Sequence, residues 1–286
     1  MQESVVESPT KSNEICSLAM VRRVAAMLDL DTHSFSTGDV LPRGWHFFML
    51  AGETRKSALR PDGFPGLGVP IPDLGLPRLL LGGRTVSYQG DIVIGSEVER
   101  ISFVKNISEK TTQSGPMAIV TIQHELRPLS EPTAAIVETQ TYILLGGKSV
   151  STKASSGNFQ SLPNFFKQKQ IIPDETLLFQ YSALGFNSHK IHLDKDYARN
   201  VEGLPDLVVN GGLATLLLTE FLRTDLGLEI TEIKVKHVAP LFCGRKMTLY
   251  IEERNPDNLG TEGGTTNLQL KIFDDNNKVA VEIEAK

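Results

Sequence analysis

The same succession of elements occurs twice along the chain, and this limits the possible folds more than any other feature. Each half contains segments in which apolar and β-branched residues alternate with polar ones, as in strands with one buried face. In the first half these segments are 97–108, 115–126 and 134–145. In the second half they are 229–238, 246–253 and 266–273, with 279–284 as a candidate fourth. Turn-rich stretches separate them, so we predict an antiparallel meander in each half.

A helix that is apolar on all sides precedes the second meander. Residues 214–222 read Ala-Thr-Leu-Leu-Leu-Thr-Glu-Phe-Leu, and a helix without a polar face is expected to be buried. An antiparallel sheet wrapped around a buried helix is the hot-dog architecture, so the two halves predict an α+β tandem, or double, hot-dog. The first half has no equally apolar helix. Its residues 51–77 are rich in proline and glycine, and we predict that this loop replaces or enlarges the central helix.

These patterns divide the chain into three parts. We predict a degenerate N-terminal hot-dog over residues 14–145, a polar linker over 146–173 and a catalytic C-terminal hot-dog over 174–286. The linker prediction rests on a glycine-, serine- and lysine-rich stretch without apolar periodicity. Within the first part, apolar residues spaced three and four apart predict an amphipathic helix over 14–30. Residues 38–50 are interpreted as a buried strand or as the wall of an acyl pocket.

Composition and charge argue against several classes of partner. The formal net charge is −5 and no run of five basic residues occurs, whereas binding to nucleic-acid phosphates requires a basic face. No apolar run reaches the ~18–20 residues that cross a bilayer, and residues 1–13 are polar and expected to fray. The two cysteines, Cys16 and Cys243, provide neither a disulfide framework nor a zinc motif. We therefore expect a cytoplasmic protein with no membrane partner, no metal and no cofactor.

A cluster of polar residues after Tyr181 is the strongest functional signal. His189 and His192 are three residues apart, Asn187 precedes His192 by five positions, and Asp194 follows it by two. Their mixed polarity fits neither a strand nor a helix, so we predict a tight turn that presents polar groups to a pocket. His192 is the best candidate for a general acid or base, because imidazole titrates near neutral pH. Asn187 cannot accept a proton but can orient a water.

The start of the apolar helix is a second candidate site. Asn210, Gly211 and Gly212 occupy its first turn, where N–H groups have no partner within the helix and the helix dipole is positive. Glycine also allows a ligand to approach the backbone closely. Such donors stabilise negative charge that develops on an oxygen, in an enolate or in a tetrahedral intermediate. The residues alone do not choose between these two chemistries.

The segment 181–194 resembles the signature of the R-specific enoyl-CoA hydratases of the MaoC-like family. It is more similar to a subgroup, the mesaconyl-CoA and itaconyl-CoA hydratase-like proteins and related 3-hydroxyacyl-thioester dehydratases, which read Tyr-Ser-Ala-Leu-Thr-Phe-Asn-x-His-Arg-Ile-His-x-Asp. Residues 41–47 resemble the subgroup's Leu-Pro-x-x-Trp-His-Trp element, and residues 76–84 resemble its Leu-Pro-Arg … Gly-Gly-Arg region. One position departs from the broad family, which has an aspartate where this chain has Asn187.

The resemblance implies a hydro-lyase that adds water to, or removes it from, the 2,3 position of an acyl thioester. His192 would carry most of the proton transfer, with Asn187 positioning the water. His189 or Asp194 would be the second proton carrier, although Asp194 could instead only orient His192 or cap a turn. The helix start at Gly211 and Gly212 would hold the thioester oxygen. Enoyl-CoA, 3-hydroxyacyl-CoA, mesaconyl-CoA and itaconyl-CoA thioesters all remain open as substrates.

The resemblance also suggests residues that contact the rest of the substrate. Trp45 and His46 would line the acyl pocket, with a buried strand as the alternative. Arg78 and Arg84 flank a glycine pair and would meet an acidic group such as a coenzyme A phosphate; the alternative is two solvated arginines beside a turn. Two other histidines, at 124 and 237, lie in alternating segments and are interpreted as structural.

Two other functions fit the same residues. A thioesterase on this fold would require a carboxylate near the thioester carbonyl, where the signature has Asn187 instead. A non-catalytic module that binds acyl thioesters would need neither proton carrier. In all three cases the expected partner is an acyl-CoA or acyl-carrier thioester, and we expect a homodimer.

Overall fold

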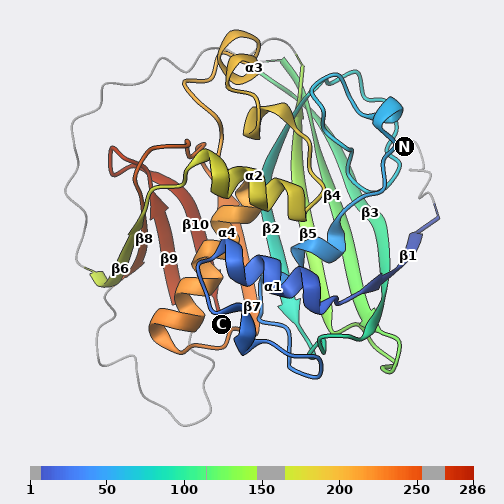
Figure 1. Ribbon diagram of the computed structural model, residues 1–286. Coiled ribbons are helices and arrows are strands. Elements are labelled where there is room, and N and C mark those ends of the chain that lie inside the picture. The colour runs from blue at the N-terminus through green and yellow to red at the C-terminus, as the bar shows by residue number, and fades with distance from the viewer. Residues whose placement is uncertain (1–7, 114, 147–164, 253–267) are drawn as a thin grey trace. The chain divides into compact units, whose positions relative to one another are not determined.

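The computed structural model describes residues 8–113, 115–146, 165–252 and 268–286 (Figure 1). The chain divides into two compact units. The first contains residues 1–148 and 181–189, and the second contains 149–180 and 190–286. Residues 147–164 of the predicted linker lie outside the described residues, and its C-terminal part forms strand β6 (Phe165–Ile171).

The first unit contains a five-stranded antiparallel sheet with the order β1-β3-β4-β5-β2. Its strands are β1 (Thr10–Ile15), β2 (Arg78–Tyr88), β3 (Glu97–Thr112), β4 (Gly115–Pro128) and β5 (Ile136–Leu145). The three predicted strands of this half are confirmed as β3, β4 and β5. Residues 10–15, expected to be frayed or helical, instead pair with β3, because pairing with a distant strand outweighs local helical periodicity.

Strand β2 corrects the prediction of a turn between two arginines. The register against β5 shifts between Leu81 and Gly83, so the glycine pair marks a β-bulge within a continuous strand. A Cβ atom on Gly82 would lie 3.0 Å from Cδ1 of Ile143. The glycine is therefore explained by close packing against the neighbouring strand.

The helices of the first unit are short. They are α1 (Leu18–Met27) and the 3₁₀ helices η1 (Thr32–Ser34), η2 (Trp45–Leu50) and η3 (Lys56–Ala58). Helix α1 is the core of the helix predicted over 14–30. The strand interpretation of 38–50 is wrong, because Gly44 turns the chain at φ +95° and the following residues form η2. Trp45 to Met49 are all buried.

The loop 51–77 contributes to the core of the first unit. Phe64 and Leu67 are buried in one cluster with Ala118, Val120 and Ile122 of β4. Further apolar loop residues pack against this cluster: Val69, Ile71, Leu74 and Leu76. The loop therefore contributes apolar side chains to the core beside β4, and its replacement of a central helix stays a prediction.

The second unit contains a five-stranded antiparallel sheet with the order β7-β10-β9-β8-β6. Besides β6, its strands are β7 (Glu232–His237), β8 (Met247–Glu252), β9 (Leu268–Phe273) and β10 (Val279–Ala285). Its helices are η4 (Lys190–His192), α3 (Lys195–Asn200) and α4 (Gly211–Glu220), which a π-helical turn (Phe221–Asp225) extends. The predicted strands and the apolar helix of this half are confirmed. Helix α2 (Glu175–Leu184) begins in the second unit and ends in the first.

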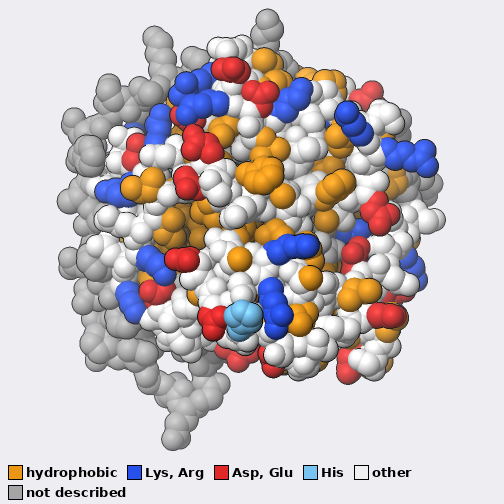
Figure 2. Space-filling model, in the orientation of Figure 1, with side chains coloured by type: hydrophobic (Ala, Val, Ile, Leu, Met, Phe, Trp, Pro, Cys, Tyr) orange, Lys and Arg blue, Asp and Glu red, His pale blue; other side chains and the backbone are white. Residues whose placement is uncertain are grey.

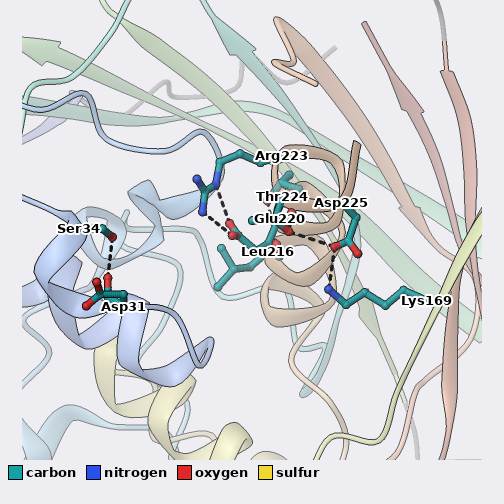
Figure 3. A network of polar contacts seen from close by, with 9 residues as sticks. Asp31, Ser34, Lys169, Leu216, Glu220, Arg223, Thr224 and Asp225 are labelled. Atoms are coloured by element: carbon teal, nitrogen blue, oxygen red, sulfur yellow. Dashed lines mark hydrogen bonds and ion pairs between the residues drawn. The ribbon is translucent and has the colours of Figure 1, made fainter. Parts of the chain in front are cut away.

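Helix α4 is buried along its length and anchored at its C-terminal end. Residues 212–220 are all buried, as expected for a helix without a polar face. Figure 3 shows the polar contacts beyond it, where the Arg223 guanidinium donates to both carboxylate oxygens of Glu220 at 3.1 and 2.5 Å. Lys169 of β6 donates to Asp225 at 2.7 Å. The first pair lies within the helical segment itself, and the Lys169–Asp225 contact links its end to strand β6.

Charges of both signs are mixed on the surface that Figure 2 shows. On the face shown in Figure 2, Lys and Arg side chains are interspersed with Asp and Glu, and the described residues of that face form no large basic patch. Among the described residues, no helix has the length and apolar character needed to cross a membrane.

Candidate active site

His192 is held in one orientation by the backbone of the second unit. It ends η4, is 8% exposed, and its Nδ1 lies 2.7 Å from the carbonyl oxygen of Val208. A carbonyl can only accept, so Nδ1 carries the hydrogen of this bond. In the neutral ring Nε2 is therefore the nitrogen with the lone pair. The imidazole is oriented as a proton acceptor at Nε2.

The segment that holds His192 leads directly into α4. The Val208 N–H donates to the carbonyl of Ile191 at 2.9 Å, and the Val209 N–H donates to the carbonyl of Leu241 at 2.8 Å. Gly211, the first residue of α4, follows Val208 by three positions. Consecutive Cα atoms are 3.8 Å apart, so the Cα of Gly211 is at most about 11 Å from that of Val208. One short backbone segment thus fixes both the histidine and the start of the helix.

Helix α4 begins with two glycines, so its first backbone N–H groups belong to residues that have no side chain of their own. The first bond within the helix runs from the Ala214 N–H to the Asn210 carbonyl at 3.0 Å. The N–H groups of Gly211 and Gly212 precede it and therefore have no acceptor within the helix. They lie at the positive end of the helix dipole. The absence of Cβ atoms allows an oxygen to approach them.

The first part of the signature packs within the first unit. Tyr181 stacks on Phe47 with ring centroids 4.5 Å apart. After α2 the chain turns sharply: Phe186 has φ +46°, and the Asn187 N–H donates to the Ser182 carbonyl at 2.8 Å. The predicted turn is present at this point, between α2 and η4. The Asn187 Oδ1 accepts the N–H of the residue two positions on, His189, at 3.0 Å.

Asp194 stabilises the start of helix α3 in the second unit. It is the N-cap of α3, and its Oδ1 accepts the Tyr197 N–H at 2.9 Å. This is one of the alternatives that the sequence left open, because an aspartate at an N-cap satisfies a first-turn donor. One of the two carboxylate oxygens, Oδ1, is therefore engaged by the helix that follows.

The residues predicted to face the acyl chain are buried in the first unit around a carboxylate that the sequence analysis missed. Trp45 is fully buried. His46 Nε2 lies 2.8 Å from one oxygen of Glu138, and Arg84 Nη1 lies 3.2 Å from the other. Burial by itself would raise the pKa of Glu138, but the Arg84 charge and the His46 hydrogen bond outweigh it and lower that pKa to about 2. Ionised Glu138 and Arg84 thus form a buried ion pair, and His46 is hydrogen-bonded to the same carboxylate.

This pairing limits what Arg84 can do. Its side chain is 11% exposed and its charge is balanced by Glu138, unlike the solvated arginine of the turn interpretation. Arg78, at the start of β2, is only partly buried. Glu138 could have been found from the alternation of β5, because Glu138, Gln140 and Tyr142 all lie at the positions that share a face with buried Ile136.

His124 fits its interpretation as structural. It lies opposite Ser102 in the register of β3 and β4, with Nδ1 2.8 Å from the Ser102 hydroxyl oxygen. Burial lowers the pKa of His124 to about 4, so it is neutral at physiological pH.

Comparison with known proteins decides the family. A family model described as hydroxyacyl-thioester dehydratase type 2 matches residues 44–243, which are 200 of the 286 residues. The chain belongs to the hydroxyacyl-thioester dehydratase type 2 family. A relative of this chain is the mesaconyl-C(4)-CoA hydratase of Chloroflexus aurantiacus, 32% identical over 232 residues that cover 80% of this chain and 81% of the relative. The mitochondrial hydroxyacyl-thioester dehydratase type 2 of Schizosaccharomyces pombe is 22% identical over 259 residues, covering 80% and 82%.

Solved structures confirm the fold of the dehydratase. A MaoC-like dehydratase superposes with a TM-score of 0.69 at 15% identity and covers 99% of this chain and 98% of its own. A Mycobacterium tuberculosis protein described as a double hot-dog superposes with a TM-score of 0.60 at 11% identity, covering 98% and 96%. The predicted α+β tandem hot-dog is therefore confirmed. Family membership also confirms the predicted enzyme class, a hydro-lyase that acts on acyl thioesters.

Proposed function

We propose that the chain catalyses the reversible hydration of the C2–C3 double bond of an enoyl-CoA thioester, with His192 as the proton acceptor. The observation that carries this proposal is the hydrogen bond from His192 Nδ1 to Val208. It leaves Nε2 as the basic nitrogen of a buried ring, within a segment that continues into the glycines of α4. A base and a set of oxyanion donors are the two groups that this chemistry needs first.

The proposed reaction consists of the addition of water to C3 and the transfer of a proton to C2. In the hydration direction, His192 Nε2 takes a proton from water while the water oxygen bonds to C3. The C2–C3 π electrons move toward the thioester oxygen, whose negative charge the N–H groups of Gly211 and Gly212 stabilise. A second proton carrier then donates a proton to C2, which gives the 3-hydroxyacyl thioester, and the proton held by His192 passes through solvent to restore that carrier. Dehydration is the reverse, with His192 returning its proton to the leaving hydroxyl.

The other predicted residues receive supporting roles in this proposal. Asn187 orients the water, because an amide can bond to water without competing for its proton. Trp45 and His46 are buried and the Arg84 side chain is 11% exposed, so in this proposal they support the site through packing within the first unit. Arg78 is the remaining candidate for an acidic part of the substrate, and it is only partly buried.

The substrate we propose to test first is mesaconyl-C4-CoA. The support is the hydratase of Chloroflexus aurantiacus, which bears that name and is 32% identical. Crotonyl-CoA is the straight-chain comparison, and an acyl-carrier thioester is the alternative to coenzyme A. We also propose that the protein is cytoplasmic and forms a homodimer. Cell fractionation tests the location, and recovery in mitochondria would contradict it. Light scattering tests the oligomeric state, and the mass of a monomer would contradict it.

The test follows the conjugated thioester by absorbance and free thiol by a thiol reagent. Loss of absorbance without free thiol is the expected result. Free thiol would indicate a thioesterase, and binding without either change would indicate a non-catalytic module; both would overturn the proposal. His192→Ala is expected to lower kcat by about 10²–10⁴-fold, the usual contribution of a positioned acid or base. His33→Ala, at an exposed histidine of the first unit, is the matched control and should keep full activity.

A further inference from the structure

The hydrogen bond that orients His192 depends on the position of a carbonyl well beyond it in the chain. The acceptor, Val208, follows His192 by 16 positions, and helix α3 (Lys195–Asn200) lies between the two residues. The chain therefore leaves His192, forms α3 and returns as the segment 205–208. Closing such a loop costs conformational entropy, so contacts must hold the returning segment in place. The contacts that hold this segment also hold the tautomer of His192.

Three side chains tie the returning segment to α3. Asp206 Oδ2 accepts from Arg199 Nη2 at 3.0 Å, and Asp206 Oδ1 lies 3.2 Å from Lys195 Nζ. The Arg199 guanidinium also donates from Nε to the Pro205 carbonyl at 3.1 Å. Glu175 approaches Lys195 as well, but at 3.7 Å it is the more distant partner. Asp206, Arg199 and Lys195 together form a contact that we term the α3 clamp.

Asp206 is the member of the clamp that belongs to the returning segment. Its Oδ1 accepts the Leu207 N–H at 2.8 Å, and its side chain is 16% exposed, against 42% for Lys195 and 49% for Arg199. Burial by itself would raise the pKa of Asp206, but the Leu207 N–H and the two cations outweigh it and lower that pKa. The carboxylate is therefore ionised at neutral pH and attracts both cations of α3.

The position of Asp206 is passed to His192 through two residues of backbone. Val208 follows Asp206 by two positions. The Val208 N–H donates to the Ile191 carbonyl at 2.9 Å, and the Val208 carbonyl accepts from His192 Nδ1 at 2.7 Å. Backbone bonds from its two neighbours lead to residues 241–243. The segment is thus bonded to residues 241–243 by its backbone and to α3 by the clamp, all within the second unit.

We propose that Asp206 is a positioning residue of the reaction, which holds the Val208 carbonyl and thereby the Nδ1–H tautomer of His192. Its effect on rate rests on the proposed function, whereas its effect on the tautomer can be observed without a substrate. Without the clamp, the segment 205–208 keeps its backbone bonds but loses its link to α3. An imidazole without a fixed acceptor samples both tautomers, and only the Nδ1–H form presents Nε2 as a base.

NMR of ¹⁵N-labelled histidines in the full chain measures the tautomer directly. At alkaline pH, at which an ordinary imidazole is neutral, His192 of the wild type should show a protonated Nδ1 and an unprotonated Nε2. Asp206→Asn keeps the acceptor for the Leu207 N–H and removes only the charge. It should raise the fraction of the Nε2–H form of His192 several-fold. An unchanged tautomer in Asp206→Asn would overturn the proposal, and the spectrum of His192→Ala assigns the signals.

Steady-state kinetics test whether this positioning matters for the reaction. Asp206→Asn should lower kcat about tenfold and change KM less than about twofold, because a displaced base slows the chemistry while contacts to the substrate remain. Asp196→Asn is the matched control, since Asp196 is exposed on the same helix and is not part of the clamp. It removes the same charge and should leave kcat unchanged. Equal losses in the two variants would attribute the effect to charge alone and contradict a positioning role.

Arg199→Ala tests the clamp from its other side. The Arg199 side chain is half exposed, and such an ion pair contributes little to stability, so the variant should fold. It should lower kcat as Asp206→Asn does, and the double variant should lose no more than either single one, because the two residues act through one contact. Losses that multiply in the double variant would show that Asp206 and Arg199 act independently, which is the opposite of a clamp.

The same variants separate this inference from the proposed function. Wild-type kcat in Asp206→Asn, together with loss of activity in His192→Ala, would overturn the positioning role and leave the proposed function standing. Full activity in His192→Ala would overturn the proposed function itself. Circular dichroism of each variant shows whether a lost rate reflects misfolding, and Asp206→Glu, which restores the charge, should recover part of both kcat and the Nδ1–H form of His192.

Discussion

Glu138→Gln is the substitution for which the structure gives the clearest magnitude. The carboxylate is 1% exposed and is held between His46 and Arg84. The amide has nearly the same shape but no charge, so the variant leaves the Arg84 guanidinium buried without a counter-ion. Removing one partner of a buried pair typically destabilises by about 3–5 kcal/mol.

The pKa of Glu138 gives an independent value. It is lowered from 4.5 to about 2, a difference that corresponds to about 3 kcal/mol. Because the folded-state pKa is the lower one, this stability is fully present above pH 4.5 and is lost as pH falls toward 2. At pH 3.5 about 2 kcal/mol would remain. The two values agree, so about 3 kcal/mol is the expected loss at pH 7.

Urea unfolding of both proteins at pH 7 and pH 3.5 would measure this difference. In thermal unfolding, a loss of ~3 kcal/mol in the stability of the first unit, which has 157 residues (148 plus 9), corresponds to a Tm that is lower by roughly 6–12 °C. Glu99→Gln is the control, since Glu99 forms a shallower pair with Arg127 on the same sheet, and its effect should be much smaller. A Glu138→Gln variant as stable as the wild type, or a difference that does not narrow at pH 3.5, would refute the reasoning.

Three further predictions concern single residues. Gly211→Ala should keep the helix, because alanine favours helices, but should lower kcat/KM at least tenfold, because its methyl group obstructs the N–H donors. Circular dichroism checks the helix and steady-state kinetics check kcat/KM. Unchanged kinetics would argue against an oxyanion site at the start of α4. Asp194→Ala should lower the free energy of unfolding by about 1 kcal/mol, because the helix cap is lost. Asp194→Asn should keep both the stability and the catalytic rate, because asparagine can also cap a helix. A large loss of rate in Asp194→Asn would show that the carboxylate has a chemical role. The pKa of His124 is lowered to about 4, so the unfolded chain binds a proton at this residue before the folded protein does. The free energy of unfolding of the wild type should therefore fall by about 3 kcal/mol as pH falls from 6.5 to 4. Denaturant unfolding over this pH range should show no such contribution in His124→Gln.

The strands and the buried helix were predictable because their signal is local. A half-buried strand repeats its apolar residues with period two, and a buried helix is apolar all round. The segments that became β3, β4, β5 and α4 carry these patterns without interruption. Strand β2 was not predicted because two glycines interrupt its pattern, and the reason for one of them, the packing of Gly82 against Ile143, is visible only in the structure.

The candidate site was predictable only in part. The signature and the glycines of α4 were found from residue types and spacing alone. The groups that lie beside them were not: the Val208 carbonyl is a backbone atom of an unremarkable residue, and Asp62, whose Oδ2 lies 3.8 Å from His189 Nε2, precedes that histidine by 127 positions. Glu138 is likewise distant in sequence from His46. Contacts across such separations leave no periodic pattern in a single sequence.

The sequence by itself determined the alternation of strands, the buried helix and the identity of the residues that can exchange protons, because each depends on neighbours within a few positions. The tertiary structure decided which nitrogen of His192 is basic, which acid lies beside His189 and whether Arg84 carries a charge that a ligand could use. Those properties depend on atoms brought within 4 Å by folding, and at that distance a single carbonyl or carboxylate fixes a tautomer or balances a charge.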